Sequence, residues 1–539
     1  MLSLSLLLAG ALLSGAAVHA AAPGITGGTA TTTGGPVFNL TAQAASLNQP
    51  DGNQVYAWGY GCNGAPAGFA PTMPNQTCGT MQVPGPTLIV TEGQTVTVTL
   101  LNGLPTAAGN TSILFPDFQV TATGGVTGLM TNEATPTATP TNTVTYSFVA
   151  STPGTHAYYS GTQGDLQIEM GLYGAIIVLP ATVPTACTSG VHASNVLAQS
   201  SASAAHPGVT ETDFRLAASA YDHPASCYDR EYLFQFAEMD LNIHRTAQAQ
   251  AALKAGCAAG AIGCSLEVPT EPYHPNYFVV NGRSMPDDMD PNYDAVYPHQ
   301  PYNGNPHMHP GEDTLIRVIG QGRWQHPFHE HGNHVRILGR DGNLITSATD
   351  PSSLAGPLLF TTTTTPGQAF DGIFYWTGRG LNWDAYGHNP NSPKVNGVFV
   401  DPAADPPCTP DANGYNTGAP LAVNYFEWCQ DHNKPLQAAP FGDVPSGGPA
   451  TLPDANIFTN GAWYSGSPYL GPDATNRATG PNSVFQPSNV QGNPANERGY
   501  AFMWHSHNER EITTNNVFPG GMFMMMLVDS REFVIDESN

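Results

Sequence analysis

The stretch Thr95-Val96-Thr97-Val98-Thr99-Leu100 alternates strictly between hydroxyl and apolar side chains. Successive side chains of a β-strand point to opposite faces, so this pattern predicts a strand with one buried face. The chain around it has 58 Gly and 48 Pro, and only 11% of its residues are charged. This composition is typical of many short strands joined by turns, and it predicts an all-β protein.

Further apolar runs divide the chain into two β units. The first unit is expected at residues 36–180, with additional strands at 86–90 and 174–179. The second is expected at residues 227–535, with strands at 231–236, 277–280, 314–318, 335–338 and 522–528. Both units end with a Gly followed by an apolar strand, which indicates two copies of one fold.

Three segments break this pattern. Residues 181–226 are rich in Ala, Ser, Thr and Pro, and we expect a linker between the units. Residues 380–500 contain long polar stretches rich in Pro, Gly and Asn, which predict loops inserted into the second unit. His244–Ala259 is rich in alanine, so a short helical insertion is expected there.

The first 22 residues, MLSLSLLLAGALLSGAAVHAAA, combine an apolar run with small residues. This pattern predicts a secretory signal peptide, and an N-terminal membrane anchor is the alternative. No later stretch approaches the roughly 20 apolar residues that a membrane-spanning helix needs. The expected location is therefore outside the cell, in a periplasm or at the cell surface.

The charge is strongly acidic: 41 Asp and Glu against 16 Lys and Arg, a formal net charge of −25. Such a chain cannot neutralise many phosphates, so nucleic acid and anionic lipid are excluded as expected partners. An acidic surface suits a solvated extracellular protein and attracts cations.

The eight cysteines make an even set, which suggests disulfides in an exported protein. They form no Cys-x-x-Cys pair and stand beside no histidine motif, so we expect structural roles. Three neighbouring pairs are natural candidates, although the sequence does not fix the connectivity: Cys62 with Cys78, Cys257 with Cys264, and Cys408 with Cys429.

Two histidine clusters carry the chemistry, His326-Pro327-Phe328-His329-Glu330-His331-Gly332-Asn333-His334 and Trp504-His505-Ser506-His507. Residues i and i+2 of a strand share a face, so each His-x-His directs two imidazoles to one side. If the two strands are neighbours, His329, His331, His505 and His507 converge on one metal. Imidazoles suit copper, zinc, iron or nickel. The alternative is that these are solvated or buried histidines without a metal.

Two further patterns are weaker metal candidates. His307-Met308-His309 precedes a turn and could touch a metal. The methionines at positions 522 and 524–526 could offer thioether ligands, but alternate residues of a closing strand are better explained as core.

The order of these motifs resembles that of the multicopper oxidases. His326-Pro327-Phe328-His329-Glu330-His331-Gly332 is similar to the family's His-Pro-x-His-x-His-Gly signature, and Trp504-His505-Ser506-His507, with the later Gly521-Met522, to its C-terminal His-Cys-His…Gly-Met signature. Further matches include Pro84-Gly85-Pro86-Thr87 and Gly171-Leu172-Tyr173-Gly174. The resemblance implies two cupredoxin-like Greek-key β-barrel or sandwich domains, with long loop insertions in the second, and copper as cofactor.

The departures from the family pattern are specific. The two first-domain histidine pairs are replaced around Leu114–Asp117 and Tyr159–Gly161, the type 1 cysteine by Ser506, and a type 1 histidine by Glu511. A blue copper site needs a thiolate with two histidines, so none is expected. Of the ligands that the resemblance implies, the chain keeps His326, the candidate Met522, and the set His329, His331, His505 and His507. One copper on three or four imidazoles is therefore expected, with Glu330, Asn333 or Glu509 as candidates to orient the rings.

The first functional hypothesis is an exported copper-dependent oxidoreductase that takes electrons from a small molecule, a metal ion or a redox protein. The second is a non-enzymatic cupredoxin protein that stores or transports copper, or that is a structural component of a surface. The third and weakest is a zinc site in a structural protein or hydrolase. The sequence does not identify the substrate, the electron partner or the oligomeric state.

Overall fold

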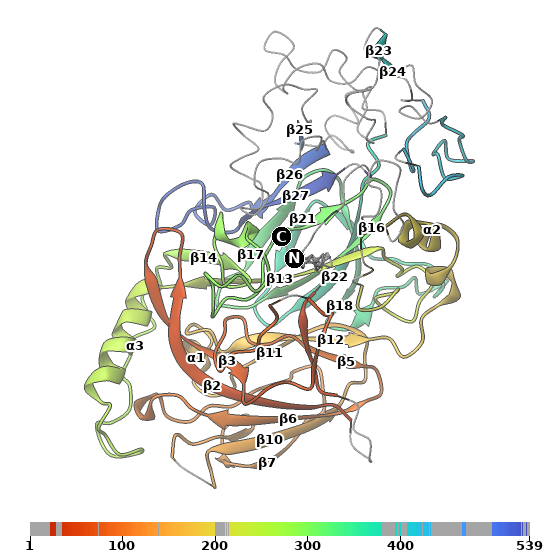
Figure 1. Cartoon of the computed structure of the whole chain (residues 1–539). Coiled ribbons are helices and arrows are strands. Elements are labelled where there is room, and N and C mark those ends of the chain that lie inside the picture. Colours follow the sequence, from red (N-terminus) through yellow and green to blue (C-terminus); the bar gives the residue numbers. More distant parts are fainter. Residues whose placement is uncertain are drawn as a thin grey trace, which may run out of the picture.

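The computed structural model describes most of the chain (Figure 1). The described residues are 22–28, 35–199 except 74, 138 and 139, 211–379 except 212 and 214, 394–395, 398–399, 407–432 except 423 and 431, 466–469, 499–529, 531 and 535. The predicted signal peptide at residues 1–22 lies outside this set apart from its last residue, as does most of the predicted loop region 380–500.

Two five-stranded sheets form the first unit. One has the order β11 (Gly154–Tyr159), β12 (Tyr173–Leu179), β5 (Leu88–Thr91), β1 (Gly24–Thr26) and β4 (Gly68–Ala70). The other has the order β3 (Gln54–Cys62), β2 (Val37–Asn48), β6 (Thr95–Asn102), β10 (Thr143–Val149) and β7 (Thr121–Gly124). Their facing side chains form one core, to which β6 contributes Val96, Val98 and Leu100, each fully buried. The alternation quoted above thus marks a strand buried on one face.

Shorter elements complete this unit. A two-stranded sheet pairs β8 (Val126–Thr127) with β9 (Asn132–Glu133). The 3₁₀ helix η1 covers Thr106–Ala108, and the single turn α1 covers Gly164–Gln167.

Two larger sheets form the second unit. The first has the order β14 (Tyr277–Val280), β13 (Arg230–Met239), β16 (Asp313–Gly320), β22 (Ala369–Tyr375), β18 (Val335–Arg340) and β19 (Asn343–Leu344), and β20 (Leu358–Leu359) also pairs with β18. The second has the order β15 (His307–Met308), β27 (Phe523–Asp529), β26 (Gly499–Ser506), β17 (His326–Glu330) and β21 (Thr361–Thr364), and β25 (Gly466–Tyr469) also pairs with β26. A pair of short strands, β23 (Lys394–Val395) and β24 (Val398–Phe399), stands apart.

The core of the second unit is aromatic and rich in methionine. Phe234, Phe328 and Trp504 pack in edge-to-face geometry, and Met522, Met524 and Met526 are fully buried. The methionines of β27 and the residue before it are therefore core residues, as the alternation favoured. The all-β class predicted from the sequence is confirmed.

The predicted linker contains ordered structure. It includes the 3₁₀ helix η2 (Thr185–Thr188) and the helix α2 (Gly190–Gln199), while residues 200–210 lie outside the described part. An apolar periodicity is absent from α2, whose Val191 and Leu197 are exposed, so the sequence pattern did not reveal it. The boundaries of the two predicted domains stay a prediction.

The predicted insertion at His244–Ala259 forms the helix α3 (Leu241–Leu253) at one edge of the molecule (Figure 1). It starts earlier than expected because the Asp240 side chain accepts the backbone N–H of Asn242 and so caps the helix. The remaining short helix, the 3₁₀ element η3, covers Asp287–Met289.

All eight cysteines form disulfides. The three predicted pairs are confirmed: Cys62–Cys78, Cys257–Cys264 and Cys408–Cys429. The fourth, Cys187–Cys227, joins η2 to the start of the second unit.

Direct hydrogen bonds connect the two units. The Thr155 hydroxyl on β11 donates to Asp371 Oδ1 on β22 at 2.6 Å, and Arg317 Nη1 on β16 donates to that hydroxyl at 3.2 Å. The Tyr221 hydroxyl donates to the other Asp371 oxygen at 2.7 Å. These groups are buried, so the contact fixes the edge of the first unit against the second.

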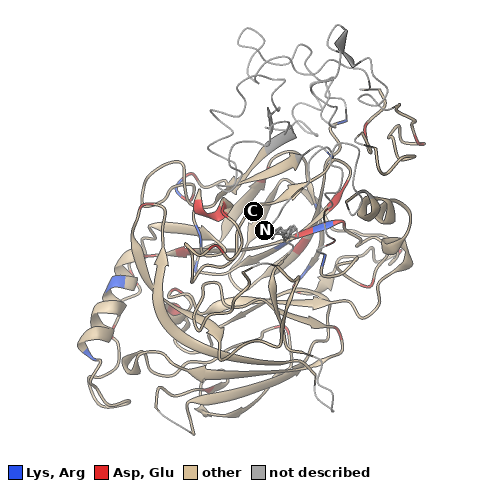
Figure 2. Cartoon of the chain, in the orientation of Figure 1, with Lys and Arg blue, Asp and Glu red and all other residues tan. Residues whose placement is uncertain are grey.

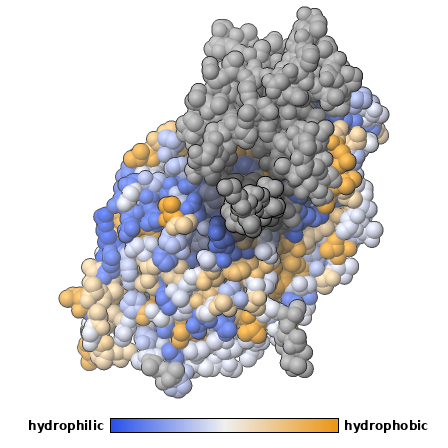
Figure 3. All heavy atoms as spheres, viewed as in Figure 1, coloured by the Kyte–Doolittle hydropathy of each residue, from blue (hydrophilic) through white to orange (hydrophobic). Residues whose placement is uncertain are grey.

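Charged residues are scattered thinly over both units (Figure 2). Apolar and polar residues are interspersed on the described part of the face in Figure 3. No helix in the described ranges has the length and apolar character needed to cross a membrane.

Candidate metal centre

Two neighbouring strands bring the His-x-His pairs together. β17 and β26 are antiparallel, and His329 stands directly opposite His505. The condition set by the sequence, that the two strands are neighbours, is therefore met. Alternate residues share a face, so His331 joins His329 and His505 on one side of the sheet.

Three imidazoles meet there. His329, His331 and His505 each offer a ring nitrogen within 4.8 Å of the others. The Nε2 atoms of His331 and His505 are 3.2 Å apart, and the ring centroids of the three are 4.7 to 5.4 Å from one another. The fourth candidate, His507, has its ring centroid 4.8 Å from that of His329, but it is exposed and not one of this converging set.

Two neighbours hold the rings in place. His329 Nδ1 is 2.6 Å from the Thr361 hydroxyl on β21, and His505 Nδ1 donates to the Ser506 carbonyl at 2.7 Å. In His505, whose partner is a carbonyl, the proton lies on Nδ1 and the lone pair lies on Nε2, the atom that can coordinate a metal.

The surroundings keep the rings of His329 and His505 neutral. Burial, reinforced by the nearby His505 and His507, lowers the pKa of His329 to about 4. Burial also lowers the pKa of His505. Since only a neutral imidazole donates a lone pair to a metal, the cluster is ready to bind one at neutral pH.

The orienting residues suggested by the sequence lie elsewhere. The Glu330 carboxylate accepts a hydrogen bond from Thr362 at 2.8 Å, and Asn333 donates to the Tyr375 carbonyl at 2.8 Å. Glu509 is exposed. The sequence did not indicate Thr361, because its role depends on the pairing of β17 with β21.

The structure places His326 apart from the cluster, where carboxylates engage both ring nitrogens. Nε2 is 3.0 Å from Glu238 Oε2, and Nδ1 is 2.9 Å from Glu511 Oε2. All three side chains are buried. Burial alone would lower the pKa of His326, but the two carboxylates raise it to about 9, so this ring is protonated at neutral pH. A protonated ring offers no lone pair, and this geometry therefore argues against the predicted role of His326 as a ligand.

The weaker candidate His307-Met308-His309 lies on and just after β15. His309 Nε2 is 2.7 Å from Glu211 Oε1, Met308 belongs to the core, and burial lowers the pKa of His307 to about 3. Neither histidine belongs to a group of converging ligand atoms found in the described residues.

Comparison with known proteins finds one matching family model. The family model described as multicopper oxidase matches residues 73–182. This part of the chain is similar to the multicopper oxidases. The match lies in the first unit and includes the segments where the sequence lacks the family's histidines. Among the curated proteins, no match was found.

Solved structures of copper oxidases and of a copper nitrite reductase are similar to this chain at low identity. The multicopper oxidase mgLAC has 14% identity and a TM-score of 0.42, with 93% of this chain and 88% of that chain covered. The blue copper oxidase from Nitrosomonas europaea has 14% identity and a TM-score of 0.41, with coverages of 91% and 85%. The copper nitrite reductase from Nitrosomonas europaea has 20% identity and a TM-score of 0.34, with coverages of 63% and 84%.

In the first unit, a hydroxyl and amide network lies beside the segments Leu114–Asp117 and Tyr159–Gly161, and Asp117 Oδ2 lies 2.8 Å from the ring of His156. The Leu114 N–H donates to the Tyr159 carbonyl at 2.7 Å, so the two segments are adjacent. Gln167 Oε1 accepts hydrogen bonds from the Thr111 and Ser160 hydroxyls at 2.9 and 2.7 Å. These groups pair their hydrogen-bond donors and acceptors with one another, and they add no imidazole to the cluster.

The positions that the sequence resemblance matches to type 1 copper ligands lie together. Ser506 donates its hydroxyl to Glu511, whose same oxygen contacts His326. The Met522 N–H donates to the Glu511 carbonyl at 2.8 Å. In place of a thiolate and a second imidazole, the pocket therefore holds a serine hydroxyl and a carboxylate bound to a protonated histidine.

Proposed function

We propose that the protein is a copper-dependent oxidoreductase that binds one copper ion through His329, His331 and His505. The observation that supports this proposal is the convergence of three imidazoles from β17, β26 and the residue that follows β17. Imidazole nitrogen suits copper, and the family resemblance favours copper over zinc, iron or nickel.

The donor set fits a copper that exchanges single electrons. When bound, copper would supply this redox chemistry, while Thr361 and the Ser506 carbonyl hold the rings of His329 and His505. No thiolate is present in the described part of the chain, since every cysteine there is in a disulfide. The proposed centre therefore lacks the intense colour of a blue site.

The electron donor proposed for this centre is a small organic reductant, a metal ion or a redox protein. We also propose that the protein is exported through residues 1–22. Four disulfides support export, because disulfides persist in oxidising compartments.

Metal analysis and electron paramagnetic resonance on the purified, copper-loaded chain test the proposal. About one copper per chain is expected. The bound copper should give an electron paramagnetic resonance signal, and the protein should lack intense blue absorption. His329→Ala and His505→Ala should each lose most of this copper. His223→Ala, which replaces a partly exposed histidine outside the cluster, is the matched control and should keep it.

The assay separates the other hypotheses. Copper binding without turnover of any dye, phenol or metal-ion donor would favour storage or transport. A preference for zinc, or equal copper content in the wild type and the His505→Ala variant, would overturn the proposal.

A further inference from the structure

A cavity of about 620 Å³ lies outside the histidine cluster. It is bordered by α2, by the loop that the Cys408–Cys429 disulfide closes, and by the ends of β13, β16 and β22. Its volume lies in the range of sites that hold small molecules. Its lining belongs to segments far apart in sequence, so folding alone brings them together.

The ends of three adjacent strands supply one wall. Asp229 directly precedes β13, Asp313 begins β16, and Tyr375 ends β22 opposite Asp313. The Asp229 N–H donates to the Asp313 carbonyl at 2.7 Å, which keeps the two aspartates side by side.

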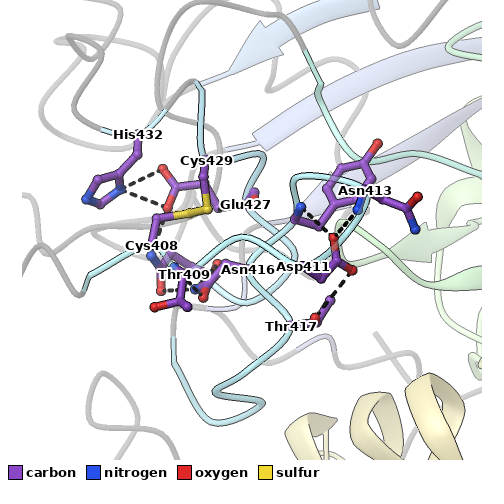
Figure 4. Close-up of a disulfide and its surroundings, with 11 residues drawn as sticks. Cys408, Thr409, Asp411, Asn413, Asn416, Thr417, Glu427, Cys429 and His432 are labelled. Atoms are coloured by element: carbon purple, nitrogen blue, oxygen red, sulfur yellow. Dashed lines mark hydrogen bonds and ion pairs between the residues drawn. A yellow bond between two sulfur atoms is a disulfide. The ribbon is translucent and has the colours of Figure 1, made fainter.

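The disulfide loop supplies the opposite wall. Figure 4 shows Asp411 with its carboxylate between Asn413 and Thr417. Asp411 Oδ1 accepts the backbone N–H groups of Asn413 and Tyr415 at 2.8 and 3.0 Å. These bonds fix a third carboxylate at the cavity.

The cavity is acidic and aromatic. Three aspartates line it, and its described lining includes neither Lys nor Arg. The rings of Tyr375, Tyr415, Tyr425 and Phe426 complete the walls. Aromatic faces attract cations, and carboxylates neutralise them.

The aspartates differ in their partners. Asp229 Oδ1 is 2.9 Å from His192 Nδ1, and Oδ2 accepts Asn195 Nδ2 at 2.7 Å and the Asp313 N–H at 2.9 Å. Among the described residues, no hydrogen bond or ion pair reaches the carboxylate of Asp313. Burial and the charge of Asp229 raise the pKa of Asp313 to about 7. A cation in the cavity would relieve this repulsion.

The nearby basic groups are already engaged. His192 on α2 contacts Asp229, and Arg531 lies 4.9 Å from the centre of the Tyr425 ring, where it donates to Asn195 Oδ1 at 3.2 Å. Arg531 also lies 3.9 Å from Glu312. Neither basic group is part of the cavity lining, and His192, whose ring lies within 4.8 Å of the carboxylates of Asp229 and Asp313, offsets only part of their charge.

We propose that this cavity is a second binding site, for a small organic ammonium ion that Asp313 pairs with and the tyrosine rings enclose. The ammonium group would donate to the Asp313 carboxylate, with Asp229 and Asp411 as further negative charges. Four aromatic rings favour a ligand that also carries an apolar or aromatic body.

Calorimetric titration of the full chain with 2-phenylethylammonium tests the proposal. The neutral analogue 2-phenylethanol has the same aromatic body and lacks the charge. At roughly pH 8, above the pKa of Asp313, the cation should bind at least tenfold more tightly than the alcohol. Equal binding of the two compounds, or no binding of the cation, would overturn the proposal.

Variants locate the site. Asp313→Asn removes the charge with almost no change in volume, and it should weaken binding at least tenfold. Asp350→Asn, on an exposed loop outside the cavity, is the matched control and should bind like the wild type. Tyr375→Leu, which removes a ring, should also weaken binding, and it decides the outcome if Asp313→Asn does not fold.

The test is independent of the proposed copper centre. His505→Ala should lose copper and keep ligand binding, since no cluster histidine lines the cavity. Unchanged affinity in both Asp313→Asn and Tyr375→Leu would overturn the second site, whatever the copper content.

Discussion

At the scale of single residues, the contrast between His326 and His329 shows how surroundings decide chemistry. The two rings lie on one strand, three residues apart. Two buried carboxylates hold a proton on His326, whereas burial beside other imidazoles removes it from His329. The first is therefore a buried cation, and the second is a candidate ligand.

The protonated His326 predicts a stability that depends on pH. Its folded pKa, about 9, is above the unfolded value of about 6.5, so its contribution is complete below pH 6.5 and is lost as pH rises through 9. The loss should be about 3 kcal/mol. Urea unfolding across this range measures it. Glu511→Gln removes one carboxylate and should flatten the alkaline decline, and an identical decline in the variant would contradict this explanation.

The pocket around His326 also predicts the result of restoring the family ligands. In Ser506→Cys/Glu511→His, a thiolate and a second imidazole would join His326, because these three side chains already meet. A thiolate with two imidazoles is the ligand set of blue copper, so added copper should produce intense visible absorption. Ser506→Cys alone, which retains the Glu511 carboxylate, is the control and should stay pale. A pale double variant would show that the pocket no longer accepts the metal.

At the scale of elements, sequence pattern succeeded where neighbours in sequence decide the structure. The alternation at 95–100 predicted β6, and the spacing of His329 from His331 and of His505 from His507 predicted shared faces. Sequence pattern failed to predict the structure where residues distant in the sequence determine it. Glu238 lies 88 residues from His326, and no local signal marks it as that residue's partner. The sequence pattern did not predict helix α2, because this helix has no apolar stripe and depends on tertiary contacts.

The Cys187–Cys227 disulfide should stabilise this segment strongly. It closes a sequence separation of 40, and closing such a loop in the unfolded chain contributes about 4 kcal/mol. Cys187→Ser/Cys227→Ser should therefore lower the free energy of unfolding by roughly this amount, measured by urea titration. The matched control is Cys257→Ser/Cys264→Ser, whose separation of 7 predicts a smaller loss. Equal losses would contradict the loop-length argument.

At the scale of the whole molecule, the two units have different roles. The second unit supplies every imidazole of the proposed copper centre, from β17, β26 and the residue that follows β17. In the first unit, a hydroxyl and amide network lies beside the segments where the resemblance predicted histidines. The first unit still contacts the second through the buried Thr155–Asp371 bond. In the proposed centre, the first unit therefore contributes contacts to the second unit and no ligand.

This division of roles predicts that stability and copper binding can be separated. Thr155→Val keeps the shape of the side chain and removes the hydroxyl that bonds to Asp371. A buried acceptor that loses a donor costs about 1–3 kcal/mol, so the variant should unfold at lower urea. Its copper content should equal that of the wild type, because no ligand comes from the first unit. A variant that loses copper while folded would show instead that the first unit shapes the centre.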